Sequence, residues 1–547
     1  MSKSEFITGF RIDLEKKQIN PARIEIAAGR IKSIVPADAK DCQQYILPGF
    51  LDAHVHIESS LMIPSEFARM AVVHGTVGTI SDPHEIANVM GVFGVEYMLR
   101  NAAKVPFHFH FGAPSCVPAT EFETAGDQID AKGVDYLMQR DDIWYLAEVM
   151  NFPGVLAGDE ELLKKIDSAR KLGKPVDGHA PGLRGKEAAA YAAAGITTDH
   201  ECFTLPEALD KIEAGMKIQI REGSAARNFD ALHTLLTTHP DKVMFCSDDK
   251  HPDSLLEGHI NLLVLRALQL GHDLFDVLNA ASKNIRDHYN LPVGMLQEGD
   301  RADFIVINNT IDFEILATYI NGIKVAGNGK TLIHSVAEEA ENRFNKREVG
   351  LEEFFVPAAA GKVKVIEALD GQLITNCISE SPLVDERGNC VSDTKRDILK
   401  LAVVNRYRQA PPALAFIKNL GLKKGAIASS VAHDSHNIVV AGCNDEDMRR
   451  AVELLMKTSG GLCAVCGEED HVLPLPVAGL MSTSDAWEIC ETYYSTRSIR
   501  EAKSWKPVGR LYETLVFMAL LVIPSIKTIN RGLFDGDRFC FTDLSES

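Results

Sequence analysis

Residues 47–58 read Leu-Pro-Gly-Phe-Leu-Asp-Ala-His-Val-His-Ile-Glu, and this stretch decides the fold. Its apolar residues predict a buried strand, and two histidines, His54 and His56, alternate at the end of that strand. Because a strand has a period of two residues, both imidazoles project from the same face. Two imidazoles on one face can bind one metal ion. One His-x-His pair is weak evidence, since a histidine at a strand end is more often a polar residue near the surface.

Further polar residues end apolar runs downstream of His56. Glu148 lies inside the apolar run 143–149, where a carboxylate is expensive to bury unless it is paired or bound to a metal. The other polar residues follow short apolar runs and are His179, His200, Asp248 and Asp249. Each residue taken alone could be an ordinary polar group, but that explanation is much weaker for the whole set in strand order.

Helical stretches separate these strands, at 158–172, 185–194, 205–214 and 229–238. Alternating strands and helices predict a parallel sheet. Polar residues recur at the C-terminal ends of the strands, where the active sites of (β/α)₈ barrels gather. We therefore predict an α/β chain built around a TIM-type barrel.

The six residues resemble the metal-binding pattern of the amidohydrolase superfamily; they are His54, His56, Glu148, His179, His200 and Asp248. Their surroundings resemble the adenine deaminases within that superfamily, in the segments 81–89, 176–182, 246–252, 279–284 and 473–481. The resemblance spans nearly the whole chain, and the first residues match least well. It implies hydrolysis of adenine to hypoxanthine and ammonia, as in purine salvage, by a hydroxide bridged between two divalent metal ions.

The resemblance also implies how the ions are held, with ligands from strands 1, 4, 5, 6 and 8 of the barrel. In many related hydrolases a carbamylated lysine on strand 4 bridges the two ions. Here no lysine lies between Lys132 and Lys164, so Glu148 is the predicted bridging ligand. One ion would be held by His54 and His56, and the other by His179 and His200. Imidazole and carboxylate suit zinc, iron or manganese alike, but the resemblance favours Mn²⁺ or Fe²⁺ over Zn²⁺.

Deamination also needs a group that carries protons. We predict Asp248 for this task, because it follows Ser247 as the family aspartate follows a serine or threonine. Asp249 is the alternative, and the sequence does not separate the two decisively. Glu85, in the predicted loop after strand 2 with His84, is the second catalytic candidate. Stabilisation of that loop explains these two residues about as well.

The composition is that of a soluble enzyme. The chain has 547 residues, enough for two or three domains, and its apolar runs are shorter than a membrane span. The start lacks the apolar core of a signal peptide, so we expect a cytoplasmic protein whose eleven cysteines are thiols. A net charge of −19 opposes binding to nucleic acid. The expected partner is a small molecule, adenine, with no nucleic acid and no membrane, and we expect a homodimer.

Three domains are predicted. Residues 1–48 and 292–345 carry short alternating strands, and we assign both flanks to one small β-sandwich domain, with Asn321-Gly322 as a hairpin turn. Residues 49–291 are the catalytic barrel. Residues 350–547 are a C-terminal α+β domain, with strands at 362–366 and 437–440 and helices at 445–456 and 501–520.

Two other functions remain open. A cyclic-amide hydrolase of the hydantoinase or dihydroorotase type is opposed by the absent strand 4 lysine and by the long third domain. A non-catalytic scaffold is opposed by the retention of all six ligand residues.

Cys463 and Cys466 have zinc-knuckle spacing, but no second pair lies at ribbon or finger spacing. His433 and His436 are interpreted as a polar turn, with an active-site wall or an extra metal site as the alternative.

Overall fold

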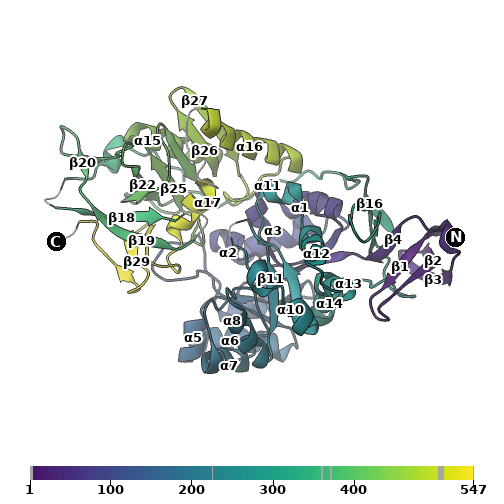
Figure 1. The fold of residues 1–547 in the computed structure, drawn as a ribbon. Helices are drawn as coiled ribbons and strands as arrows, with labels where there is room; N and C mark the ends of the chain where they lie inside the picture. Colours follow the sequence, from purple (N-terminus) through teal and green to yellow (C-terminus); the bar gives the residue numbers. More distant parts are fainter. Residues whose placement is uncertain (1–3, 225, 359–360, 370–372, 503–510, 546–547) are drawn as a thin grey trace. The chain divides into compact units, whose positions relative to one another are not determined.

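The computed structural model describes residues 4–224, 226–358, 361–369, 373–502 and 511–545 (Figure 1). The chain divides into two compact units. Unit 1 comprises Met1–His84, Val95–Cys116 and Ile129–Ala337, and unit 2 comprises Glu85–Gly94, Val117–Gln128 and Glu338–Ser547. Unit 2 therefore includes two short segments from within the predicted barrel sequence. Among the described helices, none has both the length and the apolar composition that crossing a membrane requires.

Unit 1 contains the predicted parallel strands. They are β5 (Phe50–His56), β6 (Thr76–Ser81), β7 (His108–Ala113), β8 (Ile143–Val149), β9 (Val176–Gly178), β10 (Thr198–Asp199), β11 (Lys217–Arg221), β12 (Val243–Cys246) and β13 (Asp248–Asp249). β12 and β13 are two pieces of the last strand: β12 pairs with β11, and β13 pairs with the first strand, β5. Between β9 and β10 the backbone N–H of Thr197 bonds to the carbonyl of Val176 at 2.8 Å. This curled parallel sheet confirms the predicted fold class.

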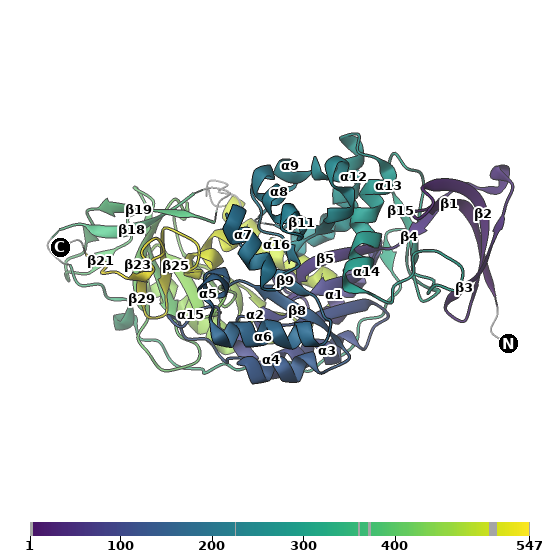
Figure 2. The ribbon, with the colours of Figure 1, turned by 90° about the horizontal axis from the view of Figure 1, so that it is seen from below.

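Helices alternate with these strands. They are α1 (Pro64–Ala71), α2 (His84–Met90), α3 (Val92–Ala102), α4 (Ala131–Met138), α5 (Phe152–Ala157), α6 (Glu160–Lys171), α7 (Gly185–Ala193), α8 (Leu205–Glu213), α9 (Phe229–Leu232), α10 (Leu235–Thr238), α11 (Pro252–Glu257), α12 (Ile260–Gln269), α13 (Leu274–Leu278) and α14 (Asn284–Tyr289). α4 and α6 lie side by side and both contact β8 (Figure 2). α6 begins where the side chain of Asp159 accepts the backbone N–H of Leu162, an ordinary N-cap.

Two local predictions were wrong. The stretch 229–238 is two short helices, because the N–H of Leu236 bonds to the carbonyl of His233, three residues back, and interrupts the regular pattern. His84 opens α2 instead of lying in a loop. The side chain of Asp82 accepts the N–H of His84 at 3.0 Å, which satisfies a donor that a helix start leaves unpaired.

A hydrophobic core joins the barrel strands to the helices outside them. Phe50, Ile218 and Phe245 come from β5, β11 and β12, and they pack with Val264 of α12 and Leu278 of α13. Full burial of such side chains contributes about 1.5–3 kcal/mol each. The strand ends that carry the polar residues are therefore held on a rigid support.

Both flanks of the barrel contribute to one further sheet of unit 1. Its order is β17-β16-β15-β14-β4-β1-β2-β3. The strands are β1 (Glu5–Asp13), β2 (Gln18–Ala27), β3 (Arg30–Pro36), β4 (Tyr45–Pro48), β14 (Phe304–Ile307), β15 (Ile315–Ile320), β16 (Ile323–Gly327) and β17 (Lys330–Thr331). β15 and β16 form the predicted hairpin, and its turn residues Asn321 and Gly322 have φ of 49° and 73°. Asparagine and glycine tolerate this left-handed backbone best.

Unit 2 is built on an eight-stranded sheet of order β19-β18-β23-β22-β25-β24-β26-β27. Its strands are β18 (Val363–Ala368), β19 (Thr375–Glu380), β22 (Ile398–Val404), β23 (Ala413–Lys418), β24 (Ala426–Ser429), β25 (Ile438–Gly442), β26 (Gly461–Cys466) and β27 (Glu469–Pro474). Small sheets are formed by β20 (Leu383–Val384) with β21 (Cys390–Val391), and by β28 (Ile526–Ile529), β29 (Gly532–Asp535) and β30 (Cys540–Phe541).

Helix α15 (Asp445–Thr458) packs on this sheet through Met448, Val452 and Leu455. The structure also has α16 (Ala486–Ala502) and α17 (Leu511–Val516). The predicted helix 501–520 lies partly outside the described residues. Cys463 and Cys466 lie on β26, where residues three apart point to opposite faces, so they do not form a zinc knuckle with each other.

Candidate active site

His54 and His56 end β5, and both are buried. Their Nε2 atoms lie 3.1 Å apart, so both rings turn the same nitrogen to one point. Nδ1 of His56 lies 3.1 Å from the carbonyl oxygen of Asp82. A carbonyl only accepts, so Nδ1 carries the proton and the lone pair of a neutral ring is on Nε2. A metal-binding histidine is typically oriented in this way.

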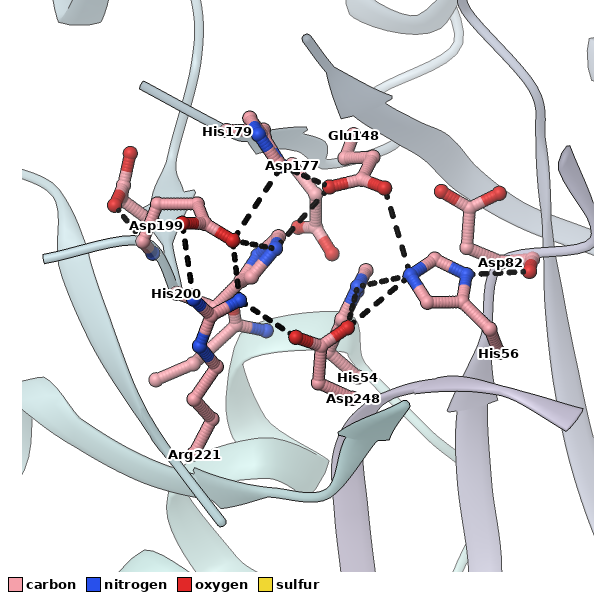
Figure 3. A network of polar contacts seen from close by, with 12 residues as sticks. His54, His56, Asp82, Glu148, Asp177, His179, Asp199, His200, Arg221 and Asp248 are labelled. Atoms are coloured by element: carbon pink, nitrogen blue, oxygen red, sulfur yellow. Dashed lines mark hydrogen bonds and ion pairs between the residues drawn. The ribbon is translucent and has the colours of Figure 1, made fainter. Parts of the chain in front are cut away.

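Glu148 lies between two groups of histidines (Figure 3). Its Oε1 is 3.5 Å from Nε2 of His56. Its Oε2 is 2.7 Å from Nδ1 of His179 and 3.1 Å from Nε2 of His200. His179 and His200 directly follow β9 and β10, so strand ends position both rings. A carboxylate with one oxygen toward each group has the arrangement that bridging two cations requires.

Asp248 completes this group. Its Oδ1 lies 3.3 Å from Nε2 of His56 and 3.8 Å from Nε2 of His54. The backbone of Asp248 is left-handed, with φ of 54°, which aspartate tolerates better than most residues. The carboxylate of Asp249 instead accepts a hydrogen bond from Ser59. The structure thus brings together His54, His56, Glu148, His179, His200 and Asp248, which we call the strand-end cluster.

The sequence analysis missed two charged residues beside this cluster. Nη1 of Arg221, the last residue of β11, lies 2.6 Å from Oδ2 of Asp248. The same guanidinium binds both carboxylate oxygens of Glu201, which follows His200 directly. A signal was present, because Arg221 follows the alternating stretch Ile218-Gln219-Ile220 and ends a strand as other site residues do.

Asp82 and His84 add a further polar layer. His84 was named in the sequence analysis, whereas Asp82 was missed, although its position directly after β6 could have suggested it. Nδ1 of His84 lies 3.3 Å from Oδ2 of Asp82 and 3.5 Å from Oε1 of Glu148. All three residues are buried.

Behind the cluster, Asp52 ties the first barrel strand to the last. Its Oδ1 accepts the N–H groups of Ser247 at 3.0 Å and His54 at 3.2 Å. Its Oδ2 lies 2.8 Å from Nε2 of His259, whose Nδ1 lies 2.7 Å from the hydroxyl of Thr76. These buried contacts fix the backbone next to His54 and Asp248.

Burial and charge shift the titration of the cluster. Burial alone would raise the pKa of Glu148, but the charge and hydrogen bond of His179 and the hydrogen bond of His200 hold that pKa well below its usual value. Burial likewise opposes ionisation of Asp248, yet Arg221 and His56 lower its pKa well below normal. Both carboxylates are therefore ionised at neutral pH.

The residues fit a pair of divalent cations. Two anionic carboxylates face four imidazoles, and each oxygen of Glu148 faces different histidines. Groups of three or four such ligand atoms lie within 4.8 Å of one another, among them His54, Glu148 and His200, and also His54, His56 and Asp248. This donor set suits borderline divalent metals.

Glu85, the second predicted catalytic residue, belongs to unit 2. Its carboxylate contacts His433 and His436 of that unit.

Comparison with known proteins agrees with this geometry. The sequence model of the amidohydrolase family matches residues 45–332, which carry the strand-end cluster. The model of the adenine deaminase C-terminal domain matches residues 372–540. An adenine deaminase of Salinibacter ruber is 51% identical over 99% of both chains. One of a Sulfurovum species is 51% identical over 97% of this chain and 98% of the relative, and one of Methanosarcina mazei is 47% identical over 98% of both.

The barrel, its strand-end cluster and the first family model define an amidohydrolase. Together with the C-terminal match and the identity over nearly the full length, they show that the chain belongs to the adenine deaminase family.

Proposed function

We propose that this chain hydrolyses adenine to hypoxanthine and ammonia, a reaction of purine salvage. The observation that carries this proposal is the identity of 47–51% over nearly the full length to relatives that are adenine deaminases. The match to the family's own C-terminal domain supports it, since that domain is not part of the amidohydrolase barrel.

The strand-end cluster would hold two divalent cations, Mn²⁺ or Fe²⁺ in preference to Zn²⁺. His54 and His56 would bind one ion, His179 and His200 the other, and Glu148 would bridge them. When bound, such cations lower the pKa of a water molecule enough to supply a nucleophile at neutral pH.

The deamination transfers both protons of one water molecule. Adenine and water give hypoxanthine and ammonia as a C6–O bond forms and the C6–N bond breaks. Of the two water protons, one ends on a ring nitrogen and the other on the leaving amine. Asp248 would accept and return such a proton. Its pKa, lowered chiefly by Arg221 against the effect of burial, keeps the carboxylate ionised at neutral pH. Glu85 is the second proposed catalytic residue.

A cyclic-amide hydrolase of the hydantoinase or dihydroorotase type is the alternative. Glu148 rather than a lysine on β8, together with the matched C-terminal domain, favours the deaminase. A cytoplasmic location and a homodimer stay predictions.

The test is direct. The purified protein, loaded with Mn²⁺ or Fe²⁺, should convert adenine to hypoxanthine with one ammonia released per hypoxanthine. The conversion is followed by absorbance, and ammonia by a coupled assay. Absence of hypoxanthine with two metal ions verified per chain would refute the proposal, and hydantoin and dihydroorotate would then be tried as substrates.

A further inference from the structure

Unit 2 contains a buried carboxylate held by two imidazoles. Both oxygens of Glu85 are in contact, Oε1 with Nδ1 of His433 and Oε2 with Nε2 of His436. The three side chains have exposed fractions of 2%, 4% and 0%. We call these three residues the Glu85 clamp.

The ring nitrogen of His436 that does not contact Glu85, Nδ1, indicates whether this histidine is a hydrogen-bond donor or a metal ligand. The backbone N–H of Ala432 donates to Nδ1 of His436 at 3.2 Å, so Nδ1 is an acceptor and carries no proton. Burial also lowers the pKa of His436 to about 4, despite the opposing charge of Glu85, so the ring is neutral at pH 7. Its one proton is then on Nε2, which donates to Glu85. A metal-binding imidazole would instead donate through its far nitrogen.

The donors of the clamp are rigid. His433 stacks on Phe517, with ring centres 5.0 Å apart and an angle of 14° between the planes. The loop that carries both histidines is tied down where the hydroxyl of Tyr407 donates to the carbonyl of Ser435 at 2.7 Å. A hydrogen bond of 2.7 Å also joins the N–H of His436 to the carbonyl of Ala432.

We propose that His433 and His436 are positioning residues, whose N–H groups hold the carboxylate of Glu85 ionised and in one orientation for proton relay in the deamination. An ionised carboxylate can accept a proton, which a proton relay requires. In the balanced reaction Glu85 takes up one of the two water protons and returns it to the ring nitrogen or the leaving amine. This inference rests on the proposed function, because it assigns Glu85 to that reaction.

Isosteric variants test the clamp. Asparagine places its amide N–H near the position of imidazole Nδ1, and glutamine near that of Nε2. His433 donates through Nδ1 and His436 through Nε2. We therefore expect His433→Asn to retain more activity than His433→Gln, and His436→Gln more than His436→Asn. Equal losses within each pair, or the reverse order, would overturn the proposal.

A double-mutant cycle asks whether the histidines act through Glu85. His433→Leu should lower kcat about tenfold to a hundredfold, the range of couplings between contacting groups, with KM and metal content nearly unchanged. In a Glu85→Gln background the same substitution should change kcat by less than about threefold. His471→Leu makes the same chemical change elsewhere in unit 2, on β27, and should leave kcat unaltered.

Three results would overturn the proposal. They are an unaltered kcat for His433→Leu, an equal loss in both Glu85 backgrounds, and a third metal ion per chain that His433→Leu removes. If His433→Leu does not fold, the isosteric pairs decide alone.

Failure of the proposed function is recognised separately. The unsubstituted protein is assayed first, and no ammonia from adenine would refute the function but not the clamp. In protein labelled with [¹⁵N]histidine, two hydrogen-bonded imidazole N–H protons should be seen. One should be lost in His433→Asn, the other in His436→Gln, and both should shift in Glu85→Gln. Absence of these two signals would overturn the clamp whatever the activity.

Discussion

Two buried groups of the molecule each surround a carboxylate with imidazoles, yet they are built for different tasks. In the strand-end cluster, Nδ1 of His56 donates to a carbonyl, so that Nε2, which faces Glu148, has the lone pair once the ring is neutral. In the Glu85 clamp, Nδ1 of His436 accepts a backbone N–H, which leaves Nε2 as a donor. The partner of the ring nitrogen far from the carboxylate thus distinguishes the proposed metal ligand from the proposed hydrogen-bond donor, although the residue types are the same.

The largest expected effect is at Glu148. Glu148→Gln should lower kcat at least about a thousandfold, because an amide has one good acceptor and bridges two cations poorly. Metal content should fall below two ions per chain, as measured by elemental analysis. Glu85→Gln is the matched control and should leave the metal content unchanged. Two ions retained by Glu148→Gln would count against its bridging role.

Asp248 and Asp249 are expected to differ sharply. Asp248→Asn should reduce turnover by about 10²–10⁴, the usual contribution of a proton-transferring group, while the protein stays folded. Asp249→Asn should be milder, since its carboxylate contacts Ser59. Steady-state kinetics of both variants, with metal content checked, measures the difference. A dead Asp249→Asn beside an active Asp248→Asn would reverse the assignment.

Metal uptake should release protons. In the metal-free cluster, burial would lower the pKa of His179, but the charges of Glu201 and Glu148 raise it to about 9. Burial is likewise outweighed at His56, whose pKa the Asp248 hydrogen bond and the Glu148 charge raise well above normal. Protonated imidazoles must lose their protons to bind metal, so affinity should fall as pH falls. Titration of metal-free protein with Mn²⁺ in weak buffer at pH 7.5 should acidify the solution, and an unchanged pH would contradict this charge state.

Glu123 is a third buried carboxyl group, and its pKa is raised rather than lowered. Burial raises the pKa of Glu123 to about 8, helped by the charge of Asp434 and opposed by Ser435 and Arg531. Because the folded pKa exceeds the unfolded one, the stabilising contribution is complete below about pH 4.5 and is lost as pH rises through 8. Glu123→Gln should therefore stabilise the protein at pH 9 by on the order of 5 kcal/mol relative to its effect at pH 4.5. Urea unfolding at both pH values measures this, and an equal effect at both would contradict it.

The sequence predicted those site residues whose position follows from a local pattern along one strand. His54, His56 and Glu148 lie at the ends of apolar strands, and a period of two residues was enough to place the two histidines on one face. The contacts around them are long-range. Asp52 meets Ser247 across 195 positions, and Glu85 meets His433 across 348. Local patterns carry no signal for such pairs.

The misplaced start of α2 has a similar cause, because it depends on one Asp82 hydrogen bond that sequence periodicity does not reveal. The sequence could have identified Arg221, because this residue ends β11 and site residues also end the neighbouring strands. What the sequence could not show was that this arginine joins Asp248 to Glu201, because that contact depends on three different strand ends meeting.

The difference between the two groups can be measured by anomalous diffraction. Crystals of the manganese-loaded protein, with data recorded above the manganese absorption edge, would locate every bound ion. The account predicts two peaks within the strand-end cluster, with Glu148 between them, and none at Glu85, His433 and His436. A peak at the Glu85 clamp, or fewer than two in a fully loaded strand-end cluster, would contradict it.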